Sequence, residues 1–186
     1  MALKATIHKA RLQLADMDRG VYLDRALTIA RHPSETDERM LVRLLAWALH
    51  TPADDTHGAL DFGKSLWDTD EPDLWEKDLT GRIRHWIDVG QPDDRRLLRA
   101  SSRADRVTVF AYASSTPVWW RAIAPKLARV RNVAVWQIDA ADSQALAALA
   151  ERTMHWHVAV QDGVVSVTSG ERGAELTPVA LTTAPK

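Results

Sequence analysis

Hydrophobic and polar residues alternate along the first thirty positions of the chain. Residues 11–14 read Arg-Leu-Gln-Leu, and the same spacing returns in residues 25–29 after turn-forming residues at 18–20. A period of two is typical of a β-strand with one buried face, and a turn between two such strands makes a hairpin. The pattern therefore predicts a long N-terminal β-hairpin over residues 1–31.

The spacing of apolar residues changes after His32 and Pro33. Leu41, Leu45 and Ala48 follow one another at intervals of four and three, which places them on one face of a helix. Ser34 has the side chain of a helix N-cap, and Asp37 follows three positions later as a weak capping box. We expect a helix over residues 34–50, with Ser34 as its cap.

The remainder of the chain alternates between short apolar runs and helical patterns, each bounded by turn residues. Strands are expected at residues 59–66, 72–77, 83–90, 106–112 and 132–138, helices at 92–102, 117–130 and 142–152, and a closing hairpin that turns at residues 162–163. The tail after Gly170 is expected to be loosely held. The order predicts an α/β (α+β) fold with a mixed sheet and flanking helices.

Length and composition favour one compact domain over residues 1–186, because the chain has 186 residues, is 46% hydrophobic and contains no linker. Within it, residues 34–112 form the expected core, preceded by the hairpin of residues 1–31 and followed by an α/β extension over residues 113–170. The sequence has neither a long apolar run nor a signal-peptide pattern. We therefore expect a cytoplasmic protein without membrane contact, and favour a monomer.

Net charge and cysteine content limit the chemistry that the chain can perform. The absence of cysteine excludes disulfides and thiolate sites, so a metal would need oxygen or imidazole ligands. A net charge of -1 gives no overall attraction to nucleic acid, and DNA or RNA would need a local basic patch. Arg95, Arg99 and Arg103 recur every fourth residue on the helix expected at 92–102, with Arg96 and Arg106 nearby. This stripe is either a phosphate-contacting surface or a solvated helix face.

Two acids face each other in the hairpin expected after residue 71. If Thr80 and Gly81 form its turn, paired positions sum to 161, as those of Asp73 and Asp88 do. Turns of two or four residues give this pairing, whereas a three-residue turn breaks it. Trp75 would then pair with a second tryptophan, Trp86, on the same face as the acids.

Facing carboxylates on neighbouring strands repel one another. A divalent cation such as Mg²⁺ or Mn²⁺ would offset that repulsion, and so would a shared proton or solvent at the strand ends. Glu38 lies on the apolar stripe of the helix expected at 34–50, and its side chain should point inward as a third acid. Alternatively, Glu38 complements the helix dipole. Asp73, Asp88 and Glu38 are therefore the predicted metal ligands.

The order of elements and several words of the sequence resemble known proteins. "EPDLW" and "WIDVGQP" resemble the motifs of PD-(D/E)XK nucleases, and with "MALKATIHKARLQLADMDRG", "RHPSETDERMLVRLLAWAL" and "DFGKSL" they resemble the YaeQ family over nearly the whole chain. The resemblance implies a restriction-endonuclease-like αβββαβ core after the N-terminal hairpin. It puts Pro72 and Asp73 in the "PD" place and Asp88 in the "D/E" place.

The sequence departs from the nuclease motif where a lysine is expected, because Gly90 stands two positions after Asp88. Gln91, re-aimed by a bulge at the glycine, or Lys64 on the preceding strand are the predicted substitutes. The resemblance implies metal-dependent phosphodiester hydrolysis by Asp73 and Asp88. The alternative is a catalytically degenerate module that binds nucleic acid or regulates a protein partner.

Overall fold

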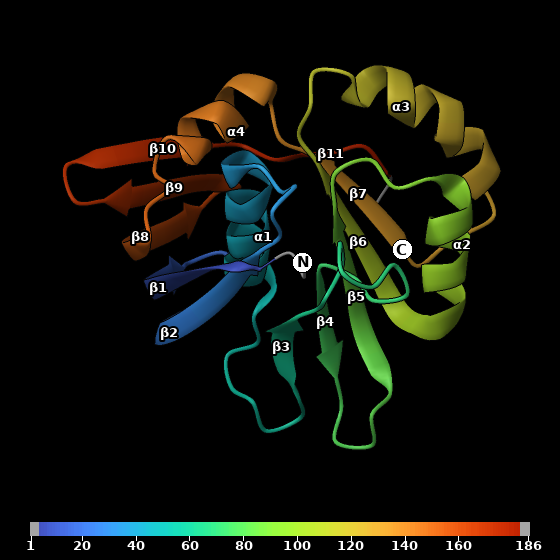
Figure 1. Ribbon diagram of the computed structural model, residues 1–186. Coiled ribbons are helices and arrows are strands. Elements are labelled where there is room, and N and C mark those ends of the chain that lie inside the picture. Colours follow the sequence, from blue (N-terminus) through green and yellow to red (C-terminus); the bar gives the residue numbers. More distant parts are fainter. Residues whose placement is uncertain (1–3, 183–186) are drawn as a thin grey trace. The chain divides into compact units, whose positions relative to one another are not determined.

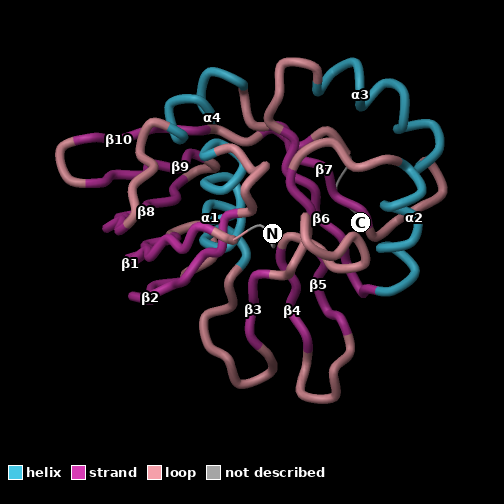
Figure 2. Tube along the Cα trace, viewed as in Figure 1, coloured by secondary structure: helices cyan, strands magenta, loops and turns pink. Residues whose placement is uncertain are grey.

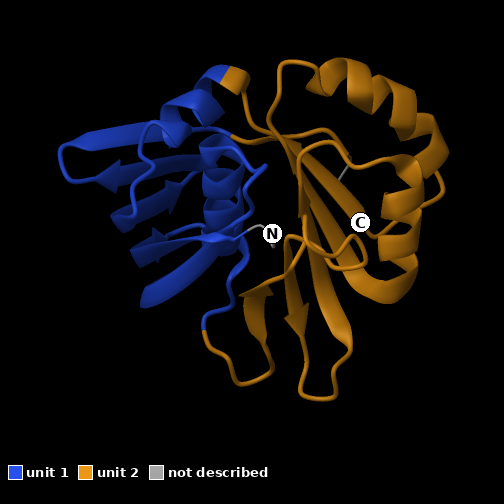
Figure 3. Ribbon diagram, in the orientation of Figure 1, with its two compact units in different colours: residues 1–53, 141–177 blue, residues 54–140, 178–186 orange. Residues whose placement is uncertain are grey.

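The computed structural model describes residues 4–182, and these divide into two compact units (Figure 3). Unit 1 comprises residues 1–53 and 141–177, and unit 2 comprises residues 54–140 and 178–186. Over the described residues the fold is α+β, with two mixed β-sheets and four α-helices (Figure 1), as the sequence predicts. The boundaries expected for a single domain stay a prediction. No helix within residues 4–182 is long and apolar enough to cross a membrane.

Unit 1 is built on a five-stranded sheet in the order β10-β9-β8-β1-β2. The predicted hairpin is confirmed, since β1 and β2 pair antiparallel over eleven residues each. β1 also pairs parallel with β8, so the N-terminal hairpin shares its sheet with the C-terminal strands. The bounds in this sheet are β1 (Thr6–Asp16), β2 (Val21–Arg31), β8 (Thr153–Gln161), β9 (Val164–Ser169) and β10 (Arg172–Leu176).

Two helices accompany this sheet, α1 (Asp37–His50) and α4 (Ala140–Ala147). The predicted cap of α1 is wrong by two residues. Thr36 is the N-cap, and its side chain accepts a hydrogen bond from the backbone N–H of Arg39, whereas Ser34 bonds to His32. Nine consecutive residues of α1, Met40–Ala48, are buried, which is the burial of a helix covered on all sides.

Unit 2 is built on a six-stranded sheet in the order β11-β7-β6-β5-β4-β3. Three inner strands of the sheet, β5, β6 and β7, run parallel to one another. β4 pairs antiparallel with β5, and β3 pairs antiparallel with β4. The bounds are β3 (Ala59–Phe62), β4 (Leu74–Lys77), β5 (Ile83–Val89), β6 (Ala104–Ala111), β7 (Val133–Gln137) and β11 (Val179–Ala180). Together with α1, the segment from β3 to β6 keeps the predicted order of a helix, three strands, a helix and a strand.

Helices α2 (Asp94–Arg103) and α3 (Thr116–Ile123) lie beside this sheet (Figure 1). They bury one of its faces in a core that includes Trp86, Leu97, Val109 and Ile123. The helix predicted to reach residue 130 ends earlier and continues as a 3₁₀ turn, η1 (Ala124–Leu127), because a proline in the second position of that turn lacks an N–H for the helical ladder.

The expectation of a loosely held tail after Gly170 is wrong for residues 171–182, and its last part, residues 183–186, lies outside the described residues. β10 pairs with β9, and β11 pairs with β7. The tail is also held by Leu181, whose backbone N–H donates to the carbonyl of Val135. The short strands of the tail carry few apolar residues, and their ordering comes from backbone pairing with strands that are distant in sequence.

Candidate functional site

The register of β4 and β5 brings Asp73 and Asp88 together, as predicted. Trp75 pairs with Trp86, whose numbers sum to 161. The turn itself has three residues, because the backbone N–H of Asp78 donates to the carbonyl of Arg82. The register shifts by one residue between Glu76 and Lys77, so that Arg84 on β5 has no partner on β4. This shift compensates for the third residue of the turn. The pairing therefore survives a turn length that would otherwise break it.

Asp73 lies directly before β4 and is 2% exposed. Its Oδ1 accepts a hydrogen bond of 2.5 Å from the Ser65 hydroxyl, and its Oδ2 accepts one of 2.7 Å from the backbone N–H of Val89. Ser65 has a φ of 40°, a left-handed conformation that a non-glycine residue holds only when its surroundings enforce it. Asp73 therefore joins the loop after β3 to the end of β5.

Asp88 is also 2% exposed and forms a bidentate pair with Arg96 on α2. The Arg96 Nε and Nη2 atoms donate to the two carboxylate oxygens, each at 2.8 Å. Burial raises the pKa of the Asp88 carboxyl above its ordinary value; the hydrogen bonds and charge of Arg96 act against this, and the charge of Asp73 adds to it. Arg96 therefore supplies a positive charge beside Asp88, which is the role that the sequence analysis gave to a metal ion.

The same guanidinium group holds the loop between β3 and β4. Arg96 donates to the backbone carbonyls of Thr69 and Glu71, at 2.5 and 2.9 Å. We call residues Lys64–Glu71 the site loop. Two further α2 arginines bind it at Asp70, Arg99 through the carboxylate at 3.0 Å and Arg103 through the backbone carbonyl at 3.2 Å. Two arginines of the predicted phosphate stripe, Arg99 and Arg103, thus have partners within unit 2. Arg96, which is next to the stripe, also has partners there.

An aromatic pair lies beside the acids. The rings of Trp75 and Trp86 meet edge to face, with centroids 6.5 Å apart, which confirms the predicted pairing. The Lys77 ammonium lies 3.3 Å from the centre of the Trp75 ring, and Arg96 and Arg103 lie 5.6 and 5.3 Å from that of Trp86. Cation–π contacts of this kind further commit the basic side chains to the protein itself.

The other predicted site residues contact other groups of the protein. Glu38 belongs to unit 1, where its carboxylate accepts a hydrogen bond of 2.6 Å from the Ser143 hydroxyl. Gln91 follows Gly90, which has a φ of 105°, and its amide donates to Ser115 at 2.8 Å. Lys64 lies in the loop after β3 and not on a strand. Its ammonium is 70% exposed and 3.9 Å from the Glu71 carboxylate.

The described donors do not fit a divalent ion. Each oxygen of Asp73 and Asp88 accepts a hydrogen bond from the protein, and within residues 4–182 no three His, Asp or Glu side chains are grouped to hold a metal. Magnesium needs oxygen ligands and several waters in an octahedron. The predicted Mg²⁺ or Mn²⁺ at Asp73, Asp88 and Glu38 stays a prediction, and no chemical step is derived from it.

Sequence reasoning missed the roles of Ser65 and Arg96. Arg96, Ala100 and Arg103 share a helical stripe, and the burial of Ala100 on it shows that this stripe faces the sheet. That spacing could have identified Arg96 as a residue directed at the sheet. Ser65 gives no comparable signal, because its partner is fixed by the folding of the loop.

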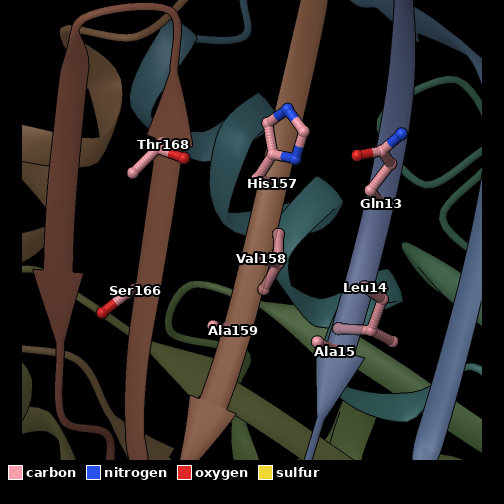
Figure 4. A pocket seen from close by; sticks show the side chains of 8 residues that line it. All are labelled: Gln13, Leu14, Ala15, His157, Val158, Ala159, Ser166 and Thr168. Carbon is pink, nitrogen blue, oxygen red and sulfur yellow. The ribbon is translucent and has the colours of Figure 1, made fainter.

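A shallow depression of about 280 Å³ lies on the sheet of unit 1 (Figure 4). Small side chains on three adjacent strands, Ala15, Ala159 and Ser166, leave space there, and His157 and Gln13 border it. No acidic or basic side chain other than this histidine is among the residues that line it. It is a stripe of small residues and does not form a second chemical site.

Comparison with known proteins identifies the family. The family model described as "YaeQ protein" matches residues 1–178. Proteins named "Uncharacterized protein YaeQ" from Salmonella typhi and Escherichia coli (strain K12) are 42% and 41% identical over 177 residues, which is 95% of each chain. The crystal structure of the YaeQ protein from Xanthomonas axonopodis pv. citri has a TM-score of 0.90 at 45% identity, with 97% of this chain and 99% of that one covered. That from Pseudomonas syringae has a TM-score of 0.90 at 41% identity, with 98% of each covered. This chain therefore belongs to the YaeQ family.

Proposed function

We propose that this chain is a non-hydrolytic binding module that regulates a protein partner through the site loop, Lys64–Glu71. In this proposal Asp73 and Asp88 keep the position of a nuclease-like acid pair and serve to hold the loop. The observation that carries the proposal is that all four of their carboxylate oxygens accept hydrogen bonds from the protein, namely from Ser65, Val89 and Arg96.

Hydrolysis is the less favoured function because a metal ion would have to displace Arg96 from Asp88. That displacement would also break the bonds from Arg96 to the site loop. Gly90 stands at the place of the motif lysine, and Gln91 bonds to Ser115. The chain would therefore have to reorganise before the predicted nuclease chemistry could begin.

Nucleic-acid binding is also less favoured, because two of the arginines on α2 are paired with acids. Arg96 pairs with Asp88, and Arg99 pairs with Asp70. The strong affinity of proteins for nucleic acid comes from cations that are available to phosphates. Arg95, Arg99 and Arg103, the predicted phosphate contacts, stay a prediction that the same experiments test.

The site loop exposes apolar side chains that suit a protein partner. Leu66 is 41% exposed and Trp67 is 44% exposed. Tryptophan is enriched among the residues that contribute most to binding energy at protein interfaces. The charged residues Lys64, Asp68, Asp70 and Glu71 flank this pair in the loop, and polar residues of this kind form the rim of such an interface. A loop held by buried hydrogen bonds loses little conformational freedom on binding.

We expect isothermal titration calorimetry to detect no binding of Mg²⁺ or Mn²⁺, and no difference between the wild type and the Asp73→Ala/Asp88→Ala variant. The physical reason is that Arg96 already neutralises Asp88. We also expect no cleavage of DNA or RNA, and no binding that strengthens steeply as salt is lowered. Metal binding that the double variant loses, together with metal-dependent cleavage, would support the nuclease prediction instead.

We expect a photo-cross-linking amino acid at position 67 to give one discrete protein adduct in cells. The same amino acid at Val118, which is 69% exposed on α3, serves as the matched control and should not give that adduct. Leu66→Ser in the position-67 variant should reduce the yield several-fold because it removes an apolar contact. An adduct that nuclease treatment digests would identify nucleic acid as the partner, and equal adducts from both positions would contradict the proposal.

A further inference from the structure

We propose that the outer edge of β2 pairs antiparallel with β2 of a second copy of this chain, which joins two five-stranded sheets into one. β2 is the last strand of its sheet (Figures 1 and 2). Its inner edge pairs with β1 along its entire length, and no other strand within residues 4–182 pairs with its outer edge. The proposal is independent of the site loop and of the function proposed for it.

β2 lacks most of the features that normally protect the edge of a sheet, although it carries the charged residues Asp24, Arg25 and Arg31. Edge strands are usually short, bulged, or interrupted by proline or lysine. β2 has eleven residues without proline, glycine or lysine, and its register with β1 is continuous. The other edge strands in the described chain are much shorter, with five residues in β10, four in β3 and two in β11. β2 is therefore the one long edge available for pairing among these.

The middle of β2 is open to solvent. Asp24, Arg25 and Ala26 are consecutive exposed residues, although neighbouring residues of a strand point to opposite faces. Tyr22 on the outer face is 63% exposed. Both faces of the sheet are therefore exposed at the middle of β2. Another strand can approach the edge there without displacing side chains that cover it.

A second copy fits this edge because the strand is self-complementary about Ala26. In an antiparallel pair related by a two-fold axis, the two Ala26 residues face each other, and paired positions sum to twice that number. Tyr22 then faces Ala30, which sets a large side chain against a small one. Asp24 faces Thr28, and Arg25 faces the apolar Leu27.

Centres at the two charged residues in the middle of the strand are worse because they bring like charges together. A two-fold axis at Asp24 sets two carboxylates opposite each other, and one at Arg25 sets two guanidinium groups opposite each other, arrangements that are destabilising. With the axis at Ala26, each Asp24 keeps its bidentate partner Arg11 on β1, at 3.0 and 3.1 Å, so its charge is already compensated. The charge pattern of the strand therefore disfavours these two registers, and the pairing of Tyr22 with the small Ala30 favours the axis at Ala26.

Sedimentation velocity over micromolar to submillimolar concentrations tests the pairing. The wild type should sediment as a dimer at the higher concentrations. Ala26→Lys places two ammonium groups opposite each other and should shift the dimer to monomer. Thr168→Lys is the matched control, since it adds the same charge on an interior strand of the sheet, and it should remain a dimer. Circular dichroism checks that both variants are folded.

Disulfide cross-linking tests the register separately. The chain has no cysteine, so Ala26→Cys introduces a single thiol. Directly facing residues of an antiparallel pair have Cβ atoms about 4.5–5.5 Å apart, within reach of a disulfide after small adjustments. Ala26→Cys should form a covalent dimer under mild oxidation, and Tyr22→Cys should not. A wild type that is monomeric throughout, a dimer that survives Ala26→Lys, or equal cross-linking of both variants would overturn the proposal.

Discussion

Replacing Arg96 with alanine is expected to lower the free energy of unfolding by about 3–5 kcal/mol near neutral pH, because it leaves a buried carboxylate without its partner. Asp88 is 2% exposed, and Arg96 donates a hydrogen bond to each of its carboxylate oxygens. The substitution also removes the donors to the carbonyls of Thr69 and Glu71. Urea unfolding followed by tryptophan fluorescence measures the change.

The effect of Arg96→Ala should depend on pH in a defined direction. Burial raises the pKa of Asp88, and Arg96 opposes that increase, so the variant should have the more strongly raised pKa. A carboxyl whose pKa is raised by folding contributes stability below its unfolded pKa and loses it as pH rises through the folded value. The deficit of the variant should therefore be small in acid, where Asp88 is protonated, and grow toward neutral pH.

Arg95→Ala is the matched control, because Arg95 is the exposed neighbour of Arg96 on the same helix. Exposed substitutions of this kind usually change stability by less than about 0.5 kcal/mol. A double variant, Asp88→Leu/Arg96→Met, should recover much of the stability lost by Arg96→Ala, since it removes both charges together. Equal effects of Arg95→Ala and Arg96→Ala would show that the buried pair does not hold the site.

Replacing Glu35 with alanine is expected to cost a comparable amount, about 3–5 kcal/mol. Glu35 and Arg43 are each 4% exposed. The Glu35 carboxylate accepts two hydrogen bonds from Arg43, at 2.7 and 2.8 Å, and one from Arg39 at 2.8 Å. Its removal takes the charged partner away from the Arg43 guanidinium in the interior of unit 1, where the carbonyl of Ala30 is a neutral acceptor.

Asp37→Ala provides the comparison for Glu35→Ala. Asp37 lies two residues away in the first turn of α1, but its side chain is 53% exposed and lies 3.5 Å from Arg31. An exposed ion pair of this kind contributes about 0–1 kcal/mol, so thermal and urea unfolding should barely change. Loss of similar stability in the two variants would contradict a special role for the buried glutamate.

The buried pair of Asp88 and Arg96 offsets part of the repulsion between the facing acids. The sequence places two carboxylates opposite one another, and repulsion between them must be offset. In this chain a guanidinium group offsets the charge of Asp88, while Asp73 is stabilised by hydrogen bonds from Ser65 and Val89. The same contacts fix the site loop, so the stability of the acid pair and the conformation of the loop are coupled.

Much of the fold was predictable from local patterns. Alternating apolar residues identified the hairpin of β1 and β2, and the spacing of Leu41, Leu45 and Ala48 identified α1. Pairing of Trp75 with Trp86 was also predicted, although it depends on a register shift after Glu76 that the sequence did not indicate. These features depend on the period of a strand or helix, which neighbouring residues determine.

The tertiary structure decided which distant groups meet. The parallel pairing of β1 with β8 joins residues that are more than a hundred positions apart, and no local pattern marks them as partners. Arg96 was recognised as basic, but its pairing with Asp88 depends on how α2 packs on β5. The sequence by itself determined most of the elements, the pairing of the two acids and the resemblance to the family. Only the packing of α2 and the site loop decided that the acids bind protein groups, because a buried charge takes whichever partner the fold brings within hydrogen-bonding distance.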